Sequence, residues 1–193
     1  MDDGFARQLD EWTGYFALMG GAAATLLGLL FVAVSLRLNI FHQREVADVR
    51  DYAALTFGTF LAAMAVAGAA LAPHEQRTIL ALALLVIGVT GLLALTRILR
   101  LTIALDRAAS RPGAPAPLNR WRGWSYALLA VGAYVAVIAA ALLLWIEHPD
   151  ALGWLAIAEG WLLGAGTVAA WILLSHAGNV GDQGPASSQP PQS

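Results

Sequence analysis

One ionisable side chain, Glu159, lies inside a long apolar stretch of the sequence. A carboxyl group is expensive to place in lipid, so an acidic residue at such a position marks a functional site by default. At 100° per residue, Trp154 and Trp161 lie almost opposite Glu159 on a helix, and the small residues Ala156 and Gly166 lie on its own side. We therefore expect Glu159 to face protein or water, with the two tryptophans toward lipid.

Few polar side chains are available to meet Glu159 in a pore or between helices. Thr25 lies near the middle of the first apolar stretch, Tyr134 near the middle of the fourth, and Arg77 in the turn after the second. Three states follow for Glu159: protonated and hydrogen-bonded, paired with Arg77, or ionised in a water-filled cavity. The alternative is a short snorkel to the membrane surface, because Glu159 follows Ala151 by roughly 12 Å of helical rise.

Small residues repeat at four-residue spacing in the first and fifth apolar stretches. Such stripes let helix backbones approach closely, since lipid provides no hydrophobic attraction between helices. They pack helices inside one protomer or, alternatively, form a contact between protomers. The helix-packing candidates are Gly20, Ala24, Gly28, Ala156, Gly160 and Gly164.

The residue types that the chain lacks exclude several kinds of chemistry. There is no cysteine and no lysine, which removes thiolate metal sites, iron–sulfur clusters, cysteine nucleophiles and Schiff-base catalysis. No serine has a Gly-x-Ser-x-Gly setting, and no histidine pair has His-Glu-x-x-His spacing. We expect no catalytic residue, no metal site and no cofactor, and a protein that is not an enzyme. The net charge of −2 provides no basic field for nucleic acid.

The elements that position these residues follow from composition. The chain is 59% hydrophobic and 12% charged, with a mean hydropathy of +0.65, whereas a soluble domain is about one quarter charged. About 20 apolar residues in a helix cross a bilayer. The sequence predicts an all-α, polytopic membrane helix bundle with five transmembrane helices, over 16–36, 53–72, 78–96, 123–146 and 151–175.

The arginines predict how the bundle is oriented. Of the 11 basic residues, all except Arg7 and Arg77 lie in the two loops after the first and third spans. Cytoplasmic loops carry the excess of basic residues, so we expect the N-terminus outside and the C-terminus inside. The expected organisation is an outer segment over 1–15, a transmembrane domain over 16–176 and a disordered tail over 177–193.

Three of these arginines are candidates for binding anions at the inner side. They are Arg37, Arg97 and Arg100, at the inner ends of the first and third spans. They could bind the phosphates of anionic lipids or form an anion-attracting inner mouth. Basic flanking of membrane spans on the cytoplasmic side accounts for them without either role.

The first span also carries a recognisable motif. The residues from Gly21 to Leu36 read GAAATLLGLLFVAVSL. This stretch resembles the first span of a group of uncharacterised small bacterial multi-pass membrane proteins, which tends to show Gly-Ala-x-Ala-x-Leu-x-Gly-Leu-Leu-Phe-Val-Ala-Val-Ser. In that group an asparagine often follows the Ser-x pair, whereas this chain has Arg37. The resemblance implies a multi-pass protein of the cell inner membrane, without an established activity.

Two functions remain from the sequence. The small-residue stripes and the single Glu159 favour a homo-oligomeric ion channel or pore. The alternative is a non-catalytic accessory or regulatory subunit of a membrane complex, with a membrane protein partner. In both cases the lipid bilayer is the principal partner.

Overall fold

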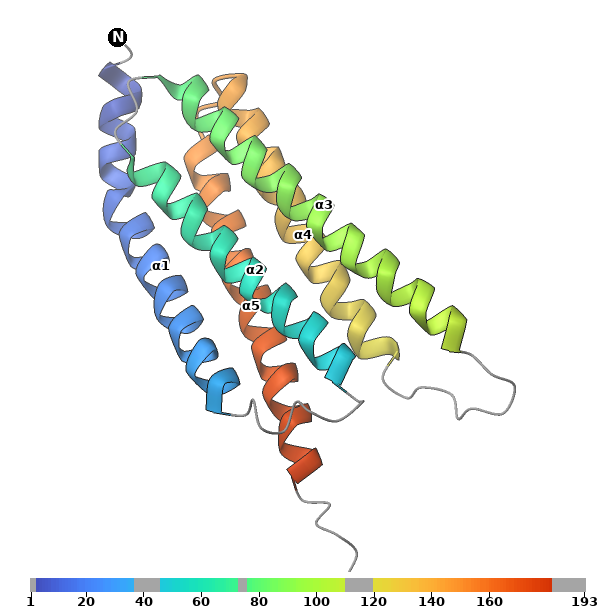
Figure 1. Cartoon of the computed structure of the whole chain (residues 1–193). Coiled ribbons are helices and arrows are strands. Elements are labelled where there is room, and N and C mark those ends of the chain that lie inside the picture. Colours follow the sequence, from blue (N-terminus) through green and yellow to red (C-terminus); the bar gives the residue numbers. More distant parts are fainter. Residues whose placement is uncertain (1–2, 37–45, 73–75, 110–119, 182–193) are drawn as a thin grey trace, which may run out of the picture.

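The computed structural model describes residues 3–36, 46–72, 76–109 and 120–181. Within these ranges the chain is all-α and contains no strand. Consecutive helices run antiparallel along one bundle (Figure 1). The helices are α1 (Asp3–Leu36), α2 (Val46–Leu71), α3 (Arg77–Ala109), α4 (Arg120–Trp145) and α5 (Ala151–Gly181).

Each of the five helices is long and apolar enough to cross a membrane. This confirms the predicted fold class, an all-α bundle with five membrane-spanning helices. The apolar segments that meet this length and composition are Gly4–Leu36, Ala53–Leu71, Arg77–Arg97, Leu128–Trp145 and Ala151–Trp171. An integral, multi-pass membrane protein follows from them.

All five helices continue beyond the predicted spans. The first begins at Asp3, the second at Val46 and the fourth at Arg120, and the third continues to Ala109 and the fifth to Gly181. Helical hydrogen bonding does not stop where apolar residues stop, and alanine and arginine are good helix formers in water. Residues 177–181, predicted as part of the disordered tail, therefore belong to α5, and the rest of the tail lies outside the described residues.

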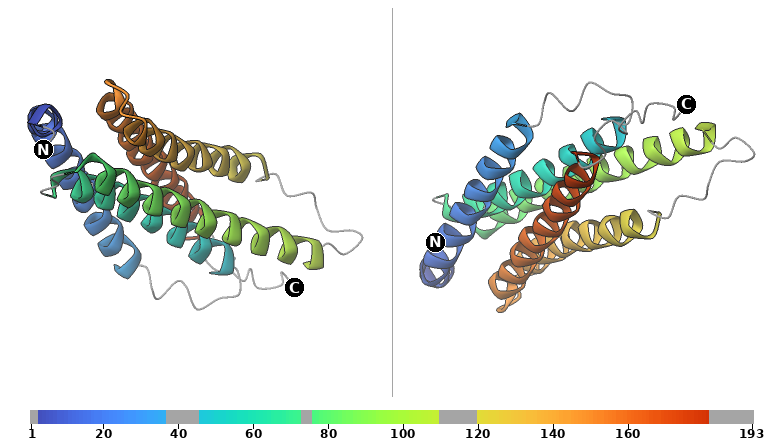
Figure 2. Two further views of the ribbon diagram at one scale, coloured as in Figure 1. Left: turned by 90° about the horizontal axis from the view of Figure 1, so that it is seen from above. Right: turned by 90° about the horizontal axis from the view of Figure 1, so that it is seen from below.

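The helices are not packed as parallel rods. Seen along the bundle from either side, they cross one another and diverge (Figure 2). Helix α2 packs against α1, α3 and α5, and α5 packs against α1, α2 and α4. We call the end where α1, α3 and α5 begin the N-terminal end of the bundle, and the opposite one the C-terminal end.

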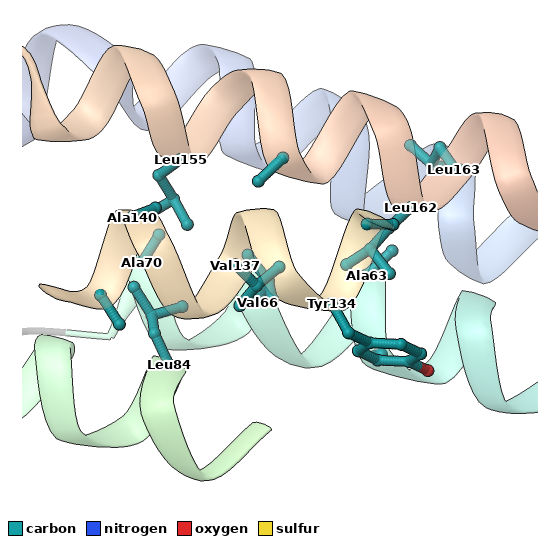
Figure 3. Packing of buried hydrophobic residues seen from close by; sticks show 14 of the residues in the cluster. Ala63, Val66, Ala70, Leu84, Tyr134, Val137, Ala140, Leu155, Leu162 and Leu163 are labelled. Carbon is teal, nitrogen blue, oxygen red and sulfur yellow. The ribbon is translucent and has the colours of Figure 1, made fainter. Parts of the chain in front are cut away.

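Small side chains fill the centre of the bundle. Leu155 of α5 lies near Ala140 of α4, and Val66 of α2 and Val137 of α4 belong to the same buried cluster (Figure 3). Where alanine or glycine lies at a contact, the helix axes approach closely. A Cβ added at Gly20 would lie only 2.8 Å from the Cβ of Ala67.

Two glycines of α5 differ sharply in their surroundings. A Cβ added at Gly166 would lie 2.8 Å from Cε1 of Phe60 on α2, closer than ordinary van der Waals contact. A Cβ added at Gly164 would meet nothing within 4 Å. Gly166 is therefore required for the contact between α2 and α5, and Gly164 is not.

The turn from α4 to α5 is closed by backbone hydrogen bonds. The amide of His148 donates to the carbonyl of Leu143 at 2.9 Å, and the amide of Glu147 donates to the carbonyl of Leu144 at 3.2 Å. These two bonds are those of a Schellman motif, which normally has glycine at the left-handed position. Here that position is Glu147, with φ of 57°. The turn therefore holds a non-glycine residue in a costly conformation.

Candidate functional site

Glu159 is completely buried in the bundle. Its side chain is 0% exposed, whereas Trp154 is 53% and Trp161 is 42% exposed on the other side of α5. This confirms the prediction that Glu159 faces protein and the tryptophans face outward. It excludes the snorkelling alternative, in which the carboxyl group would reach the surface.

The surroundings of the Glu159 carboxyl group are apolar. Both oxygens are buried, and neither has a hydrogen-bond partner among the described residues. The nearest buried residues along the same helix, Leu155, Ala158 and Leu162, are hydrophobic. A buried polar group without a partner is destabilising, so this position is exceptional in a core made of alanine, leucine and valine.

The partners expected for Glu159 are engaged elsewhere. Thr25 is exposed and its hydroxyl donates to the carbonyl of Gly21 at 2.8 Å. The hydroxyl of Tyr134 makes a long bond of 3.4 Å to the carbonyl of Gly58. The structure therefore does not bring Glu159, Thr25 and Tyr134 into one polar site.

Arg77 does not pair with Glu159 either. Its guanidinium group lies over the ring of Phe5, 4.7 Å from the ring centroid. This cation–π contact joins the first turn of α3 to that of α1 at the N-terminal end of the bundle. Of the states expected for Glu159, the ion pair with Arg77 is not present.

Tyr15 of α1 is a polar side chain beside this site. Its hydroxyl donates to the backbone carbonyl of Ala156 at 2.8 Å, and it lies within electrostatic range of the Glu159 carboxyl group. Neighbouring rings hold it: Trp12 lies edge-on at 5.7 Å and Phe16 edge-on at 5.5 Å between centroids. The sequence gives no signal for this contact, because Tyr15 and Ala156 lie far apart in the chain.

A groove opens between α1 and α5 beside Tyr15. It has a volume of about 650 Å³ and lies at the N-terminal end of the bundle. Two glycines of α5, Gly153 and Gly160, line the groove. A Cβ added at Gly153 would meet nothing within 4 Å, so the groove is open at this position. The residues that line the groove are Trp12, Tyr15, Asp150, Gly153, Trp154, Ala156, Ile157 and Gly160.

Tyr134 belongs to a second, smaller cavity. This cavity, of about 50 Å³, lies between α2, α3 and α4 and includes Gly58, Thr59 and Gly91. The hydroxyl of Thr59 donates to the carbonyl of Thr56 at 2.9 Å within α2. The cavity is large enough for a single water molecule, and it is separate from Glu159.

The small-residue stripes divide between packing and open surface. Gly20 packs on Ala67, Ala156 is buried, and a Cβ added at Gly160 would lie 3.7 Å from both the Tyr15 hydroxyl and Cε of Met19. The other members of the stripes are exposed, and nothing lies within 4 Å of a Cβ added at the glycines among them. They are Ala24, Gly28 and Gly164.

The arginine candidates are only partly described. Arg97 and Arg100 are exposed on α3, and Arg37 lies outside the described residues. Their binding of anionic lipid or of an anion stays a prediction. Among the described residues, no group of three or more histidine, cysteine, aspartate or glutamate side chains is placed to hold a metal ion.

Comparisons with known proteins provide no further guide. No protein-family model, no curated protein and no solved structure matches the chain. The family resemblance of residues 21–36 therefore stays a prediction. The functional argument rests on the geometry of the bundle alone.

Proposed function

We propose that this multi-pass membrane protein forms a homo-oligomer through α1 and conducts ions along the axis of that oligomer. One exposed face of α1 carries the proposal. At seven-residue spacing it presents Gly14, Gly21, Gly28 and Ser35, all exposed. Nothing lies within 4 Å of a Cβ added at any of the three glycines.

Glycine on an exposed helix face lowers the stability of the helix, so its presence there indicates another role. Within a helix it is about 1 kcal/mol less favourable than alanine, and lipid does not require it. Its benefit in a membrane is close approach of another helix. A spacing of seven residues keeps the small residues on one side, as left-handed helix pairs require. A face that is uncharged along its length can also contact a second copy of itself.

The same face supports a pore. Beside the glycines it carries the hydroxyl groups of Thr25 and Ser35 and the exposed apolar side chains of Leu18 and Val32, and no charged residue between Leu18 and Ser35. In a ring of α1 helices these hydroxyls would line the axis. Glu159 is buried between the helices of one protomer, so it would not line such a pore.

The location and orientation of the protein are part of the proposal. We place it in the cell inner membrane with its N-terminus outside. The resemblance of the first span supports the location, and the arginines of the loops after the first and third spans support the orientation.

Cysteine cross-linking tests the contact, because the chain has no cysteine of its own. We expect Gly21→Cys to form a disulfide-linked dimer in native membranes, since two such residues on touching helices lie within bonding distance. Val86→Cys, on the exposed face of α3, is the matched control and should stay monomeric. Equal cross-linking of both variants would contradict the α1 contact.

Ion flux tests the pore separately. Liposomes containing the wild-type protein should pass small ions, and Gly21→Leu should abolish flux because the larger side chain separates the α1 helices. A bilayer that stays silent over a range of voltage and pH would refute the pore but not the oligomer. Recovery from native membranes with one different stoichiometric protein would instead favour an accessory subunit.

A further inference from the structure

The groove between α1 and α5 combines open space with negative charge. Asp150 lies at its mouth and is exposed. Asp10, Glu11 and Glu147 are also exposed at this end of the bundle. The electrostatic potential at this place favours the binding of cations over anions.

The walls of the groove are aromatic. Trp12 and Tyr15 come from α1 and Trp154 comes from α5. The faces of such rings attract ammonium groups electrostatically, and several rings around one volume are the usual solution for a substituted ammonium ion. The remaining wall of Ala156 and Ile157 suits the apolar part of the same ligand.

The hydroxyl of Tyr15 fixes one side of the groove. Tyr15 lines the groove and donates to the carbonyl of Ala156 at 2.8 Å. Glu159 belongs to the same helical turn of α5 as Ala156 and Gly160, but it does not line the groove. Its carboxyl group is fully buried.

We propose that this groove is a binding site for a substituted ammonium cation, held by the rings of Trp12 and Trp154 and by the carboxyl group of Asp150. The ammonium group could be carried by a free solute or by a lipid headgroup, because the chemistry recognised is the same. The site lies within one protomer, so it does not depend on the proposed oligomer or pore.

Calorimetric titration of choline tests the proposal. The protein is placed in nanodiscs of phosphatidylglycerol, which contain no ammonium group of their own. We expect saturable binding of choline and none of its uncharged isostere, in which carbon replaces the ammonium nitrogen. Equal binding of the two compounds, or no saturable binding of choline, would overturn the proposal.

Variants identify the residues that hold the cation. We expect Trp154→Leu to weaken choline binding about tenfold, the effect of losing one cation–π contact in a partly dehydrated site. Trp171→Leu, at a position 73% exposed further along α5, is the matched control and should bind as the wild type does. Asp150→Asn, at an exposed position, tests the charge without risk to the fold and should weaken binding to a smaller extent. Unchanged binding by Trp154→Leu would refute the proposal.

The source of the ammonium group is distinguished by lipid composition. In nanodiscs of phosphatidylcholine, a headgroup that enters the groove would compete and lower the apparent affinity for added choline by tenfold or more. Unchanged affinity in those nanodiscs would identify a free solute as the ligand.

Discussion

The unpartnered carboxyl group of Glu159 predicts that its removal stabilises the protein. The substitution is Glu159→Met. Methionine is unbranched, similar in length, and adapts to irregular space in a core. It replaces a buried polar group that has no hydrogen bond with an apolar one that needs none.

The magnitude follows from the burial. Both carboxyl oxygens are buried and have no partner among the described residues, and the side chain is 0% exposed. A buried polar group in this state costs about 1–3 kcal/mol of stability. We therefore expect Glu159→Met to raise the free energy of unfolding by about 2 kcal/mol. For a chain of this size, that corresponds to a rise of about 4–8 °C in the midpoint of thermal unfolding.

Thermal unfolding of the purified protein in one detergent measures the effect, in the absence of any organic cation. Glu159→Gln is the matched control, because its amide still needs hydrogen bonds and should give a smaller gain.

Destabilisation of the protein by Glu159→Met would contradict this prediction. If Glu159→Met lowers the midpoint by several degrees while Glu159→Gln leaves it unchanged, the carboxyl group has a partner in the folded protein. Its role would then be structural. An equal loss in both variants would lead to the same conclusion, with the charge itself as the stabilising feature.

Three further predictions concern the packing of α5, the turn between α4 and α5, and the orientation of the bundle. Gly166→Ala should lower stability by about 1–3 kcal/mol in thermal unfolding, because the added Cβ overpacks the contact with α2, whereas Gly164→Ala should not; equal effects would contradict the described packing of α5. Glu147→Gly should raise stability by about 1 kcal/mol, since glycine adopts the left-handed conformation without the steric cost; a loss in the same unfolding measurement would show that the glutamate side chain stabilises the turn. When an impermeant thiol reagent is added to intact cells, a single cysteine at Asp150 should react and a single cysteine at Ser110 should not; the reverse pattern would invert the orientation.

The five helices and the inward direction of Glu159 could be predicted because both depend on local periodicity. Long apolar stretches predict membrane helices whatever their neighbours are. The angle between Glu159 and Trp154 depends only on the geometry of one helix. Even the behaviour of Thr25 is local, since a threonine in a helix commonly bonds to the carbonyl four residues before it.

The neighbours of Glu159 could not be predicted, because they depend on which helices pack together. Tyr15 lies far away in the sequence and meets Ala156 only because α1 packs on α5. The four-residue stripes divide between packed and open positions for a geometric reason: each step of four residues turns the helix by about 40°. Gly20 therefore packs on α2, whereas Gly28 has turned away to the open surface. A step of seven residues turns it by only about 20° in the other direction.

The side wall of the groove has a consequence for how a ligand would arrive. Ile157, which lines it, is 59% exposed on the outer surface of α5, within a segment apolar enough to span the membrane. The opening therefore faces the acyl chains as well as the water, and a ligand that first dissolves in the bilayer reaches it by lateral diffusion. Each methylene group on an alkylammonium ion adds about 0.8 kcal/mol to its partition into lipid. The apparent affinity, measured against the aqueous concentration, should then increase about fourfold per methylene, although no contact within the groove changes.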